Sequence, residues 1–513
     1  MYPDGFHLRQ NFDNLNRLIL VGQEDNTNTN LLSQYATYAY NPDSTRRSIV
    51  RGNGVQTDYT YEGAPATGRV RSINHYIPGN PAKTISNRTY GYDQLSRMLS
   101  FQKSNSPQYN PLENGTGDSY GYDAAGQLTS GAYASPTGSN PASEAFAYDG
   151  TGNRTSVNGV AYTLNASKSN QYQTAGSFGA VGYDTHGNLN NLTATGSSFG
   201  ASYDAEDRMY FAQVDVNNVF QSVSLNYDAL GRCVQRTING VTTNYYYDGW
   251  NLIEEDNSGG VTQKRYVHGP ATDELAALWS GSSNSWAWYH YDARGSVTHL
   301  TDSAGNIVEQ YSYSAFGTPS YYDGAGSPLT GSAIGNRFLF QGREWIGELA
   351  LYDFRNRMYH PGIGRFLQPD PLRLDAGDQN IYRFCNNDPI NSSDPLGMDD
   401  FNFGDLNSPI GDLNIASLSN YSNGSNGEVP SYFPGPDFSP LFAGGAAATA
   451  VDSTQSITNS GWSGGSSDLG FGIGSAGLGI GGNGFFGSVD SSGGDGGESG
   501  SVIFELTPVV REM

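Results

Sequence analysis

The sequence has only two cysteines, Cys233 and Cys385, and they stand far apart without a CxxC partner. Zinc sites need clustered Cys and His ligands, so this spacing argues against a zinc centre. The seven histidines show neither HxxxH nor HExxH spacing, and no other metal site is predicted from them. We expect no cofactor. The sequence leaves open whether the two cysteines form one disulfide or stay as small buried side chains.

Basic residues are also scarce, with 27 Lys and Arg against 50 Asp and Glu, for a net charge of −23. Phosphate contacts need basic stripes, so we expect no nucleic-acid partner. No run approaches the roughly 18 apolar residues of a membrane span, and the N-terminus has no basic-then-apolar signal-peptide layout. If the protein is exported, we expect a route for which this sequence contains no recognisable signal. A missing upstream part is an equal alternative, since the sequence begins within a repeat pattern.

What the sequence has in abundance is glycine, 67 residues, and tyrosine, 35 residues, while only 15% of residues are charged. Glycine supplies the positive φ that tight turns need, and tyrosine suits pleated, half-buried surfaces. This composition predicts an all-β protein with many turns.

From Tyr90 a unit recurs in which an aromatic residue, any residue, Tyr and Asp precede a short turn and a polar residue beside an apolar one. The copies are YGYDQLSRM, YGYDAAGQL, FAYDGTGNR, VGYDTHGNL, ASYDAEDRM, LNYDALGRC, YYYDGWNLI and YHYDARGSV. Alternate residues of a strand share one face, so the two rings lie side by side. The Asp is expected to bond the backbone two residues on, and the Gly near the fourth place to take the left-handed position of the turn.

Each unit therefore predicts a strand, a tight turn and a returning strand. One hairpin cannot bury its apolar face alone, so the units are expected to stack edge to edge into a long sheet that twists and coils on itself. The tyrosines and aspartates of the repeat are interpreted as ladder and turn residues, and none is predicted to be catalytic.

The composition changes in the segment from Phe338 to Gly397, which is rich in aromatic and arginine residues. Asp-Pro turns at Asp370 and Asp394 bracket a strand-like IYRFC in this segment. We interpret it as a closing element for the sheet.

The repeats followed by YDFRNRMYHPGIGRFLQPDP resemble the YD repeats and core domain of bacterial Rhs proteins, of Tc-toxin C components and of the teneurin YD shell. The resemblance implies a shell of spiralling antiparallel β-hairpins with the core domain as an inner plug. It divides the chain into degenerate YD-like strands (1–89), a YD-repeat shell (90–317), an Rhs repeat-associated core domain (318–398) and a variable tail (399–513). About 390 residues before the tail leave room for an open fragment that pairs with another chain.

In Rhs toxins and Tc-toxin C components the core domain is similar to an aspartyl protease that cuts its own chain after the second of two DPxG motifs. Carried onto this sequence, the resemblance implies Asp370 and Asp394 as the catalytic carboxylates and cleavage after Gly397-Met398. Arg373 replaces the usual Gly of the first motif, and Met398 stands where Leu is usual.

Two further residues are weaker candidates in the same segment. Arg365 is predicted to orient a carboxylate by a bidentate pair, and Asp388 is a third acidic candidate. The alternative stays open that Arg365 makes a structural ion pair and that the Asp-Pro sequences at Asp370, Asp388 and Asp394 are only turns.

The tail, residues 399–513, is acidic and rich in Gly and Ser, with no His, Cys or Lys and a single Arg, Arg511. Such a composition cannot form a dense core, so we expect it to be largely disordered apart from one strand in SVIFELTPVV. Nuclease, deaminase and ADP-ribosylating enzymes need basic or metal-ligating side chains, so no enzymatic toxin is predicted in the tail.

Two functions follow from these observations. The first is a secreted or cell-surface bacterial shell protein of polymorphic-toxin or secretion-system type, which encloses its C-terminal segment and cuts after Met398. Its partners would be that segment and another shell or secretion-apparatus chain. The alternative is a non-catalytic cell-surface module that binds glycans or other proteins through its aromatic-rich sheets.

Overall fold

The structure is a computed structural model of the chain. It describes residues 2–27, 30–63, 68–104, 110–113, 115–134, 142–398 and 401–402, all of which belong to one compact unit, Met1–Gly444. The predicted disordered tail and its expected last strand, from residue 403 onward, lie outside the described residues.

Most of the described residues belong to one sheet of 29 strands, from β1 (Leu8–Phe12) to β29 (Pro328–Leu329). Each strand pairs antiparallel with the next strand in the sequence, as in β18 (Met209–Val216), β19 (Val219–Tyr227) and β20 (Cys233–Ile238). The prediction of an all-β chain of stacked hairpins is confirmed.

The turn of each repeat is built on its aspartate. Oδ1 of Asp228 accepts hydrogen bonds of 2.9 Å from the backbone N–H groups of Leu230 and Arg232, while Oδ2 accepts one of 2.8 Å from Nε of Arg232. Both backbone bonds and a bond from the side chain at the fourth position recur at Asp13, Asp93, Asp123, Asp149, Asp184, Asp204 and Asp302. The bond two residues on was predicted; the one to the fourth side chain was not.

The expected left-handed position of the turn is also present. Gly231 has a φ of +80°, and where the repeat lacks glycine, Asp207 adopts a φ of +60° in its place. Asp and Asn tolerate this conformation better than other non-glycine residues.

The tyrosine of each repeat joins its hairpin to the one before. The hydroxyl of Tyr227 donates to the backbone carbonyl of Met209 at 2.6 Å. Equivalent bonds to the preceding unit are made by Tyr40, Tyr92, Tyr122, Tyr148, Tyr203, Tyr247, Tyr291 and Tyr313. Arginine from the earlier repeat lies over the ring of the later tyrosine, as with Arg208 and Tyr227, 5.2 Å from Cζ to the ring centroid. Successive hairpins are therefore linked through side chains as well as through the ladder.

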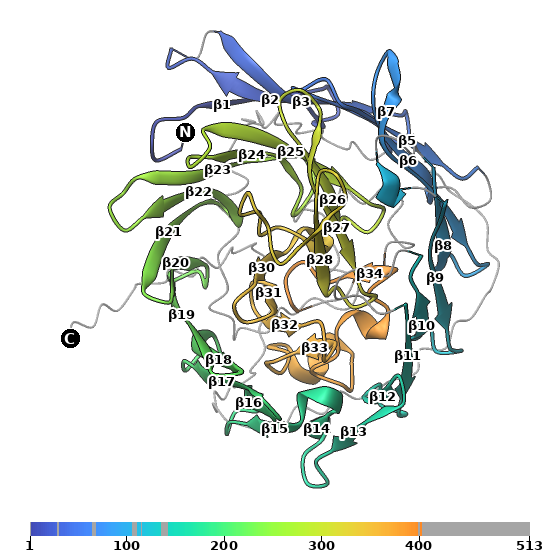
Figure 1. Ribbon diagram of the computed structural model, residues 1–513, viewed down its shortest axis with the longest axis vertical. Coiled ribbons are helices and arrows are strands. Elements are labelled where there is room, and N and C mark those ends of the chain that lie inside the picture. Colours follow the sequence, from blue (N-terminus) through green and yellow to red (C-terminus); the bar gives the residue numbers. More distant parts are fainter. Residues whose placement is uncertain are drawn as a thin grey trace, which may run out of the picture. The chain divides into compact units, whose positions relative to one another are not determined.

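The sheet turns back on itself, so that early strands lie against later ones (Figure 1). Arg46 makes a bidentate ion pair with Glu274, at 3.0 and 2.9 Å, and Nε of Arg51 donates to the carbonyl of Tyr289 at 2.7 Å. We call this contact the seam. Its elements are β4 (Arg46–Arg51), β5 (Gln56–Tyr61), β6 (Val70–Ile77), β7 (Asn80–Tyr92), β24 (Leu275–Ser280), β25 (Ser285–Tyr291) and β26 (Val297–Thr301).

The segment after the sheet forms a second, four-stranded sheet of β30 (Glu344–Ile346), β31 (Leu351–Asp353), β32 (Met358–His360) and β33 (Arg365–Phe366). It lies inside the curve of the long sheet (Figure 1). Tyr352 and Tyr359 are fully buried in one cluster with inward residues of the long sheet such as Leu225. Their hydroxyls donate to the carbonyls of Gly317 and Phe316. The prediction that this segment closes the sheet is confirmed.

We predict that Tyr227→Phe lowers the free energy of unfolding by about 1–2 kcal/mol, because the carbonyl of Met209 loses its side-chain donor. Tyr210→Phe is the matched control, since Tyr210 is 48% exposed and its change is expected to stay within about 0.5 kcal/mol. Urea unfolding measures both. Equal values for the two variants would contradict a role for the tyrosine bond in joining hairpins.

Candidate functional site

The structure brings Asp370 and Asp394 together on one arginine that was not predicted, Arg357. Nη2 of Arg357 lies 2.8 Å from Oδ2 of Asp370 and 3.2 Å from Oδ2 of Asp394. Arg357 immediately precedes β32, whereas Asp394 immediately follows β34 (Ser392–Ser393). The backbone N–H of Asp370 donates to the carbonyl of Ile381 at 2.7 Å, which fixes the first aspartate beside the second.

These three charged side chains are almost completely withdrawn from water. The exposed fractions of the side chains are 2% for Arg357, 7% for Asp370 and 0% for Asp394. Buried charges are tolerated only when paired and hydrogen-bonded. One guanidinium between two carboxylates leaves a single negative charge in the group when both carboxylates are ionised. Two carboxyl groups held in one buried cluster are the arrangement that acid–base hydrolysis by an aspartate pair would need.

The chain at the expected cleavage point is tied to this group. Oδ1 of Asp394 accepts a 2.9 Å hydrogen bond from the backbone N–H of Met398, and Nε of Arg357 donates to the carbonyl of Gly397 at 2.5 Å. Asn356 donates to the carbonyl of Leu396 at 2.9 Å. The residues before the expected scissile bond are thus hydrogen-bonded to Asp394, Arg357 and Asn356.

The chain beyond the expected bond is held as well. Residue 399 lies outside the described residues, but β35 (Phe401–Asn402) pairs antiparallel with β34, with Ser393 opposite Phe401. Gly397 has a φ of +66°, and a Cβ there would lie 2.5 Å from the carbonyl oxygen of Phe354. The bend after Asp394 therefore needs glycine at this position.

The other two candidate residues, Arg365 and Asp388, make different contacts. Arg365 donates from Nη1 to the carbonyl of Asn170 at 2.7 Å and from Nη2 to Oδ1 of Asn153 at 3.0 Å. Its guanidinium lies 3.8 Å from the ring centroid of Tyr172. It joins the core segment to the long sheet, and Arg357, rather than Arg365, is the arginine that contacts both carboxylates.

Asp388 is bound by a neighbouring amide. Nδ2 of Asn391 lies 2.9 Å from both oxygens of its carboxyl group, and it also donates to the hydroxyl of Tyr122. Burial raises the pKa of Asp388 to about 7. This carboxyl group thus faces a strand of the long sheet through Asn391.

The sequence offered only a weak signal for Arg357. It stands in FRNRMYHPG, where a second arginine, Arg355, lies two residues away and nothing local distinguishes the two positions. The decisive contacts reach 13 residues forward to Asp370 and 37 to Asp394 (370 − 357 and 394 − 357), and no local pattern encodes them.

The described residues contain no group of three or more His, Cys, Asp or Glu side chains that could hold a metal ion. In the same part of the chain, no helix is long and apolar enough to cross a membrane. Cys233 and Cys385 are both buried, and no disulfide joins them.

We predict that Asp388→Asn removes a pH dependence of stability. The folded carboxyl group keeps its proton up to about pH 7, whereas the unfolded one loses it near pH 4. Between these values the free energy of unfolding of the native chain therefore falls by up to about 1.4 kcal/mol per pH unit. Relative to the native chain, the free energy of unfolding of the variant should rise by about 2–4 kcal/mol from pH 4.5 to pH 7.5. Denaturant titrations at both pH values measure this, and a constant difference would contradict it.

Similar proteins support the fold. A family profile described as Teneurin YD-shell matches residues 81–390. The crystal structure of TcdB2-TccC3 without its hypervariable C-terminal region superposes on 76% of this chain and 20% of that one, with a TM-score of 0.53 and 19% identity. A Photorhabdus luminescens Tc holotoxin pore superposes on 76% of this chain and 21% of that one, with a TM-score of 0.57 and 18% identity.

Among curated proteins, the tRNA nuclease WapA of Bacillus subtilis (strain 168) is 32% identical over 262 residues, which are 49% of this chain and 11% of WapA. The double-stranded DNA deaminase toxin A of Burkholderia cenocepacia (strain H111) is 26% identical over 348 residues, 61% of this chain and 22% of the toxin. The chain thus spans only a small part of these relatives. Because the profile covers more than half of the sequence, including both the repeats and most of the core segment, the chain belongs to the teneurin YD-shell family.

Proposed function

We propose that this chain is an Rhs-type shell protein that encloses its own C-terminal segment and cuts itself after Met398. The observation that carries the proposal is the buried group of Asp370, Asp394 and Arg357, hydrogen-bonded to Gly397 and Met398. A carboxylate pair needs no cofactor for peptide hydrolysis, because one group can take a proton from water while the other supplies one.

The reaction consumes one water molecule. One carboxylate takes a proton from the water as its oxygen adds to the carbonyl carbon of Met398. The other carboxyl group, which starts protonated, gives its proton to the carbonyl oxygen in the same step. The tetrahedral intermediate then collapses: the C–N bond to Asp399 breaks, the leaving amine takes the proton from the first carboxyl group, and one hydroxyl of the intermediate returns a proton to the second. Arg357 holds the carbonyl of Gly397 and balances charge between the aspartates. It is a positioning residue in this scheme.

The departures from the family pattern fit this geometry. Arg373, in place of the usual glycine, adopts a φ of +55°. A non-glycine residue there costs about 1–2 kcal/mol of backbone strain. The strain is local, because the backbone N–H groups of both Leu372 and Arg373 still bond to Asp370.

The relatives suggest the setting in which the cut would act. Two of them are named as a tRNA nuclease and a double-stranded DNA deaminase toxin, and the similar solved structures are Tc-toxin assemblies. We propose that this chain is secreted or displayed at a bacterial surface, with residues 399–513 as its enclosed segment and another shell or secretion-apparatus chain as its partner. The acidic tail does not support an action on nucleic acid by this chain.

The test is the intact mass of the purified chain beside Asp370→Asn and Asp394→Asn. We expect two fragments that meet after Met398 in the native chain, and a rate lower by about 10²–10⁴-fold in each variant, since each carboxylate has an acid–base role. Asp388→Asn is the matched control: another buried aspartate of the segment, expected to cut as the native chain does.

A single uncut mass for the native chain would leave Asp370 and Asp394 as turn residues. Glycan or cell binding by that uncut chain would then favour the alternative, a non-catalytic surface module. Cleavage that survives both aspartate variants would also overturn the proposed mechanism.

A further inference from the structure

Three of the seven histidines lie buried in the seam, where the early strands meet the later ones. The exposed fractions are 2% for His75 on β6, 0% for His290 on β25 and 1% for His299 on β26. The self-cleavage scheme uses none of them. We call these three residues the histidine group.

His75 connects the early strands to β25. Its Nε2 lies 3.0 Å from the carbonyl oxygen of Tyr291, and its Nδ1 lies 2.7 Å from Oγ1 of Thr57. Arg51 donates from Nη1 to the same hydroxyl at 2.5 Å. A carbonyl oxygen can only accept, so Nε2 of His75 carries a proton and donates to Tyr291. A neutral ring then accepts the hydroxyl proton of Thr57 at Nδ1, whereas a protonated ring would compete with Arg51 for the same hydroxyl oxygen.

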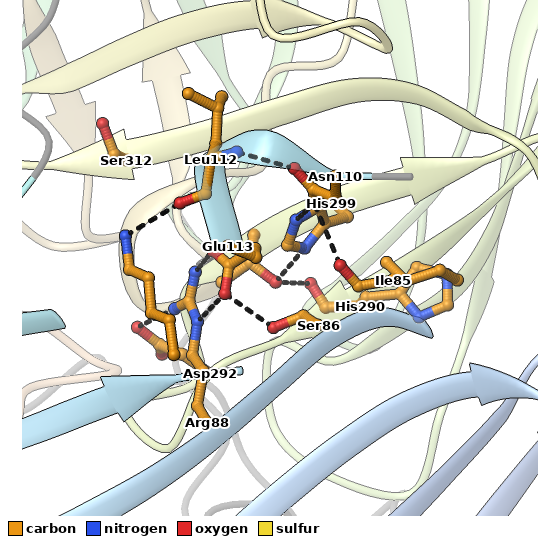
Figure 2. Close-up of polar contacts among 12 residues, drawn as sticks. Ile85, Ser86, Arg88, Asn110, Leu112, Glu113, His290, Asp292, His299 and Ser312 are labelled. Carbon is orange, nitrogen blue, oxygen red and sulfur yellow. Dashed lines mark hydrogen bonds and ion pairs between the residues drawn. The ribbon is translucent and has the colours of Figure 1, made fainter. Parts of the chain in front are cut away.

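His299 makes the corresponding connection from the later side (Figure 2). Its Nε2 accepts a 3.1 Å hydrogen bond from Nδ2 of Asn110, which also donates to the carbonyl of Ile85 on β7. Nδ1 of His299 lies 2.9 Å from Oγ1 of Thr298. An Nε2 that accepts cannot carry a proton, so this ring is also neutral.

His290 is the cross-strand partner of His299 and packs against His75. Its ring centroid is 5.1 Å from that of His75, and its Nε2 is 2.9 Å from Oγ1 of Thr301. Its Nδ1 is buried without a hydrogen-bond partner among the described residues. A proton added there would have no acceptor waiting for it.

The charges around the group disfavour a further positive charge. Arg51 faces it from β4, Arg88 from β7 and Lys103 from β8 (Met98–Lys103). The facing carboxylate is Glu113 on η1 (Pro111–Glu113), which already accepts from Arg88 and Ser86 (Figure 2). Asp292 lies 3.9 Å from Arg88 and also pairs with Arg294.

Desolvation and these cations act in the same direction. Burial, followed by the charge of Arg51, holds the pKa values of His75 and His290 well below the usual range. Burial lowers the pKa of His299 to about 4, and the carboxylate of Glu113 opposes this only in part.

We propose that the histidine group is an acid-operated latch, whose protonation breaks the contacts across the seam and releases β4–β7 from β25–β26. The closed seam requires neutral rings at three neighbouring positions. At neutral pH the rings contribute their hydrogen bonds without charge, and the shell stays closed. In an acidic compartment the same rings favour the open arrangement, in which water can solvate them.

The direction and steepness follow from proton linkage. An open seam exposes histidines of ordinary pKa, about 6.5, whereas the closed seam binds protons only at lower pH. Below about pH 6.5 the open state therefore holds up to three more protons. Each of them raises the opening equilibrium constant by up to tenfold per pH unit.

The test is hydrogen–deuterium exchange of the full chain between pH 7.5 and 5.0, corrected for the intrinsic pH dependence of exchange. We expect the opening constant for peptides of β5, β6 and β7 to rise at least tenfold per pH unit below pH 6.5, while peptides of β31 and β32 stay protected. His75→Gln and His299→Gln should each lower the slope by about one proton. His186→Gln is the control, since His186 is 55% exposed and pairs with Asp207 at the surface.

Two results for the native chain would overturn the proposal, and neither needs a variant to fold. One is an opening constant of the seam that changes by less than one proton's worth per pH unit. The other is that seam peptides open together with the core peptides at every pH. Seam variants that fold and keep the full slope of the native chain would contradict the assignment to the histidines.

Discussion

The hydrogen bond from a repeat tyrosine to a backbone carbonyl of the preceding hairpin is the interaction on which the architecture depends. A ladder of backbone bonds alone would leave the angle between hairpins to the general twist of strands. A tyrosine that bonds back to the previous unit, with an arginine over its ring, fixes the angle between each hairpin and its neighbour. We attribute to these repeated bonds the curvature that brings β4 to the later strands and closes the seam.

The curved sheet and the core segment complete one another. The inner face of the long sheet carries apolar residues, and the aromatic side chains of β31 and β32 lie against them. Those same strands flank Arg357, so the packing of Tyr352 and Tyr359 also positions the guanidinium between the two aspartates. A buried charge group of this kind needs a rigid surrounding to keep its geometry.

Much of this could be predicted from the sequence, because the repeat is local. Strand alternation, the bond two residues on from Asp228 and the left-handed place of Gly231 all follow from a few consecutive residues. The closing role of the segment after Phe338 followed from its change in composition. The approach of Asp370 to Asp394 was implied by family resemblance, and the structure places them together.

What the sequence did not indicate depends on distant residues. Arg357 is one of several arginines in its segment, and only the folded chain singles it out; Arg365, which was predicted to orient a carboxylate, binds Asn153 instead. The pairing of Arg46 with Glu274 joins residues 228 positions apart. Among the seam histidines, His290 and His299 face each other across one hairpin, but His75 reaches them only after the sheet has turned back on itself.

The central claim is that the later hairpins of the long sheet, such as β19 and β20, form one cooperative unit with the core segment, with the carboxylates assembled inside it. Native-state hydrogen exchange at pH 7.5 across a series of low urea concentrations tests it most directly. Amides of β31 and β32 should open with the same free energy and the same urea dependence as amides of β19 and β20, because each sheet buries the apolar face of the other. Core amides that open in a separate, smaller step while the long sheet stays protected would contradict the account.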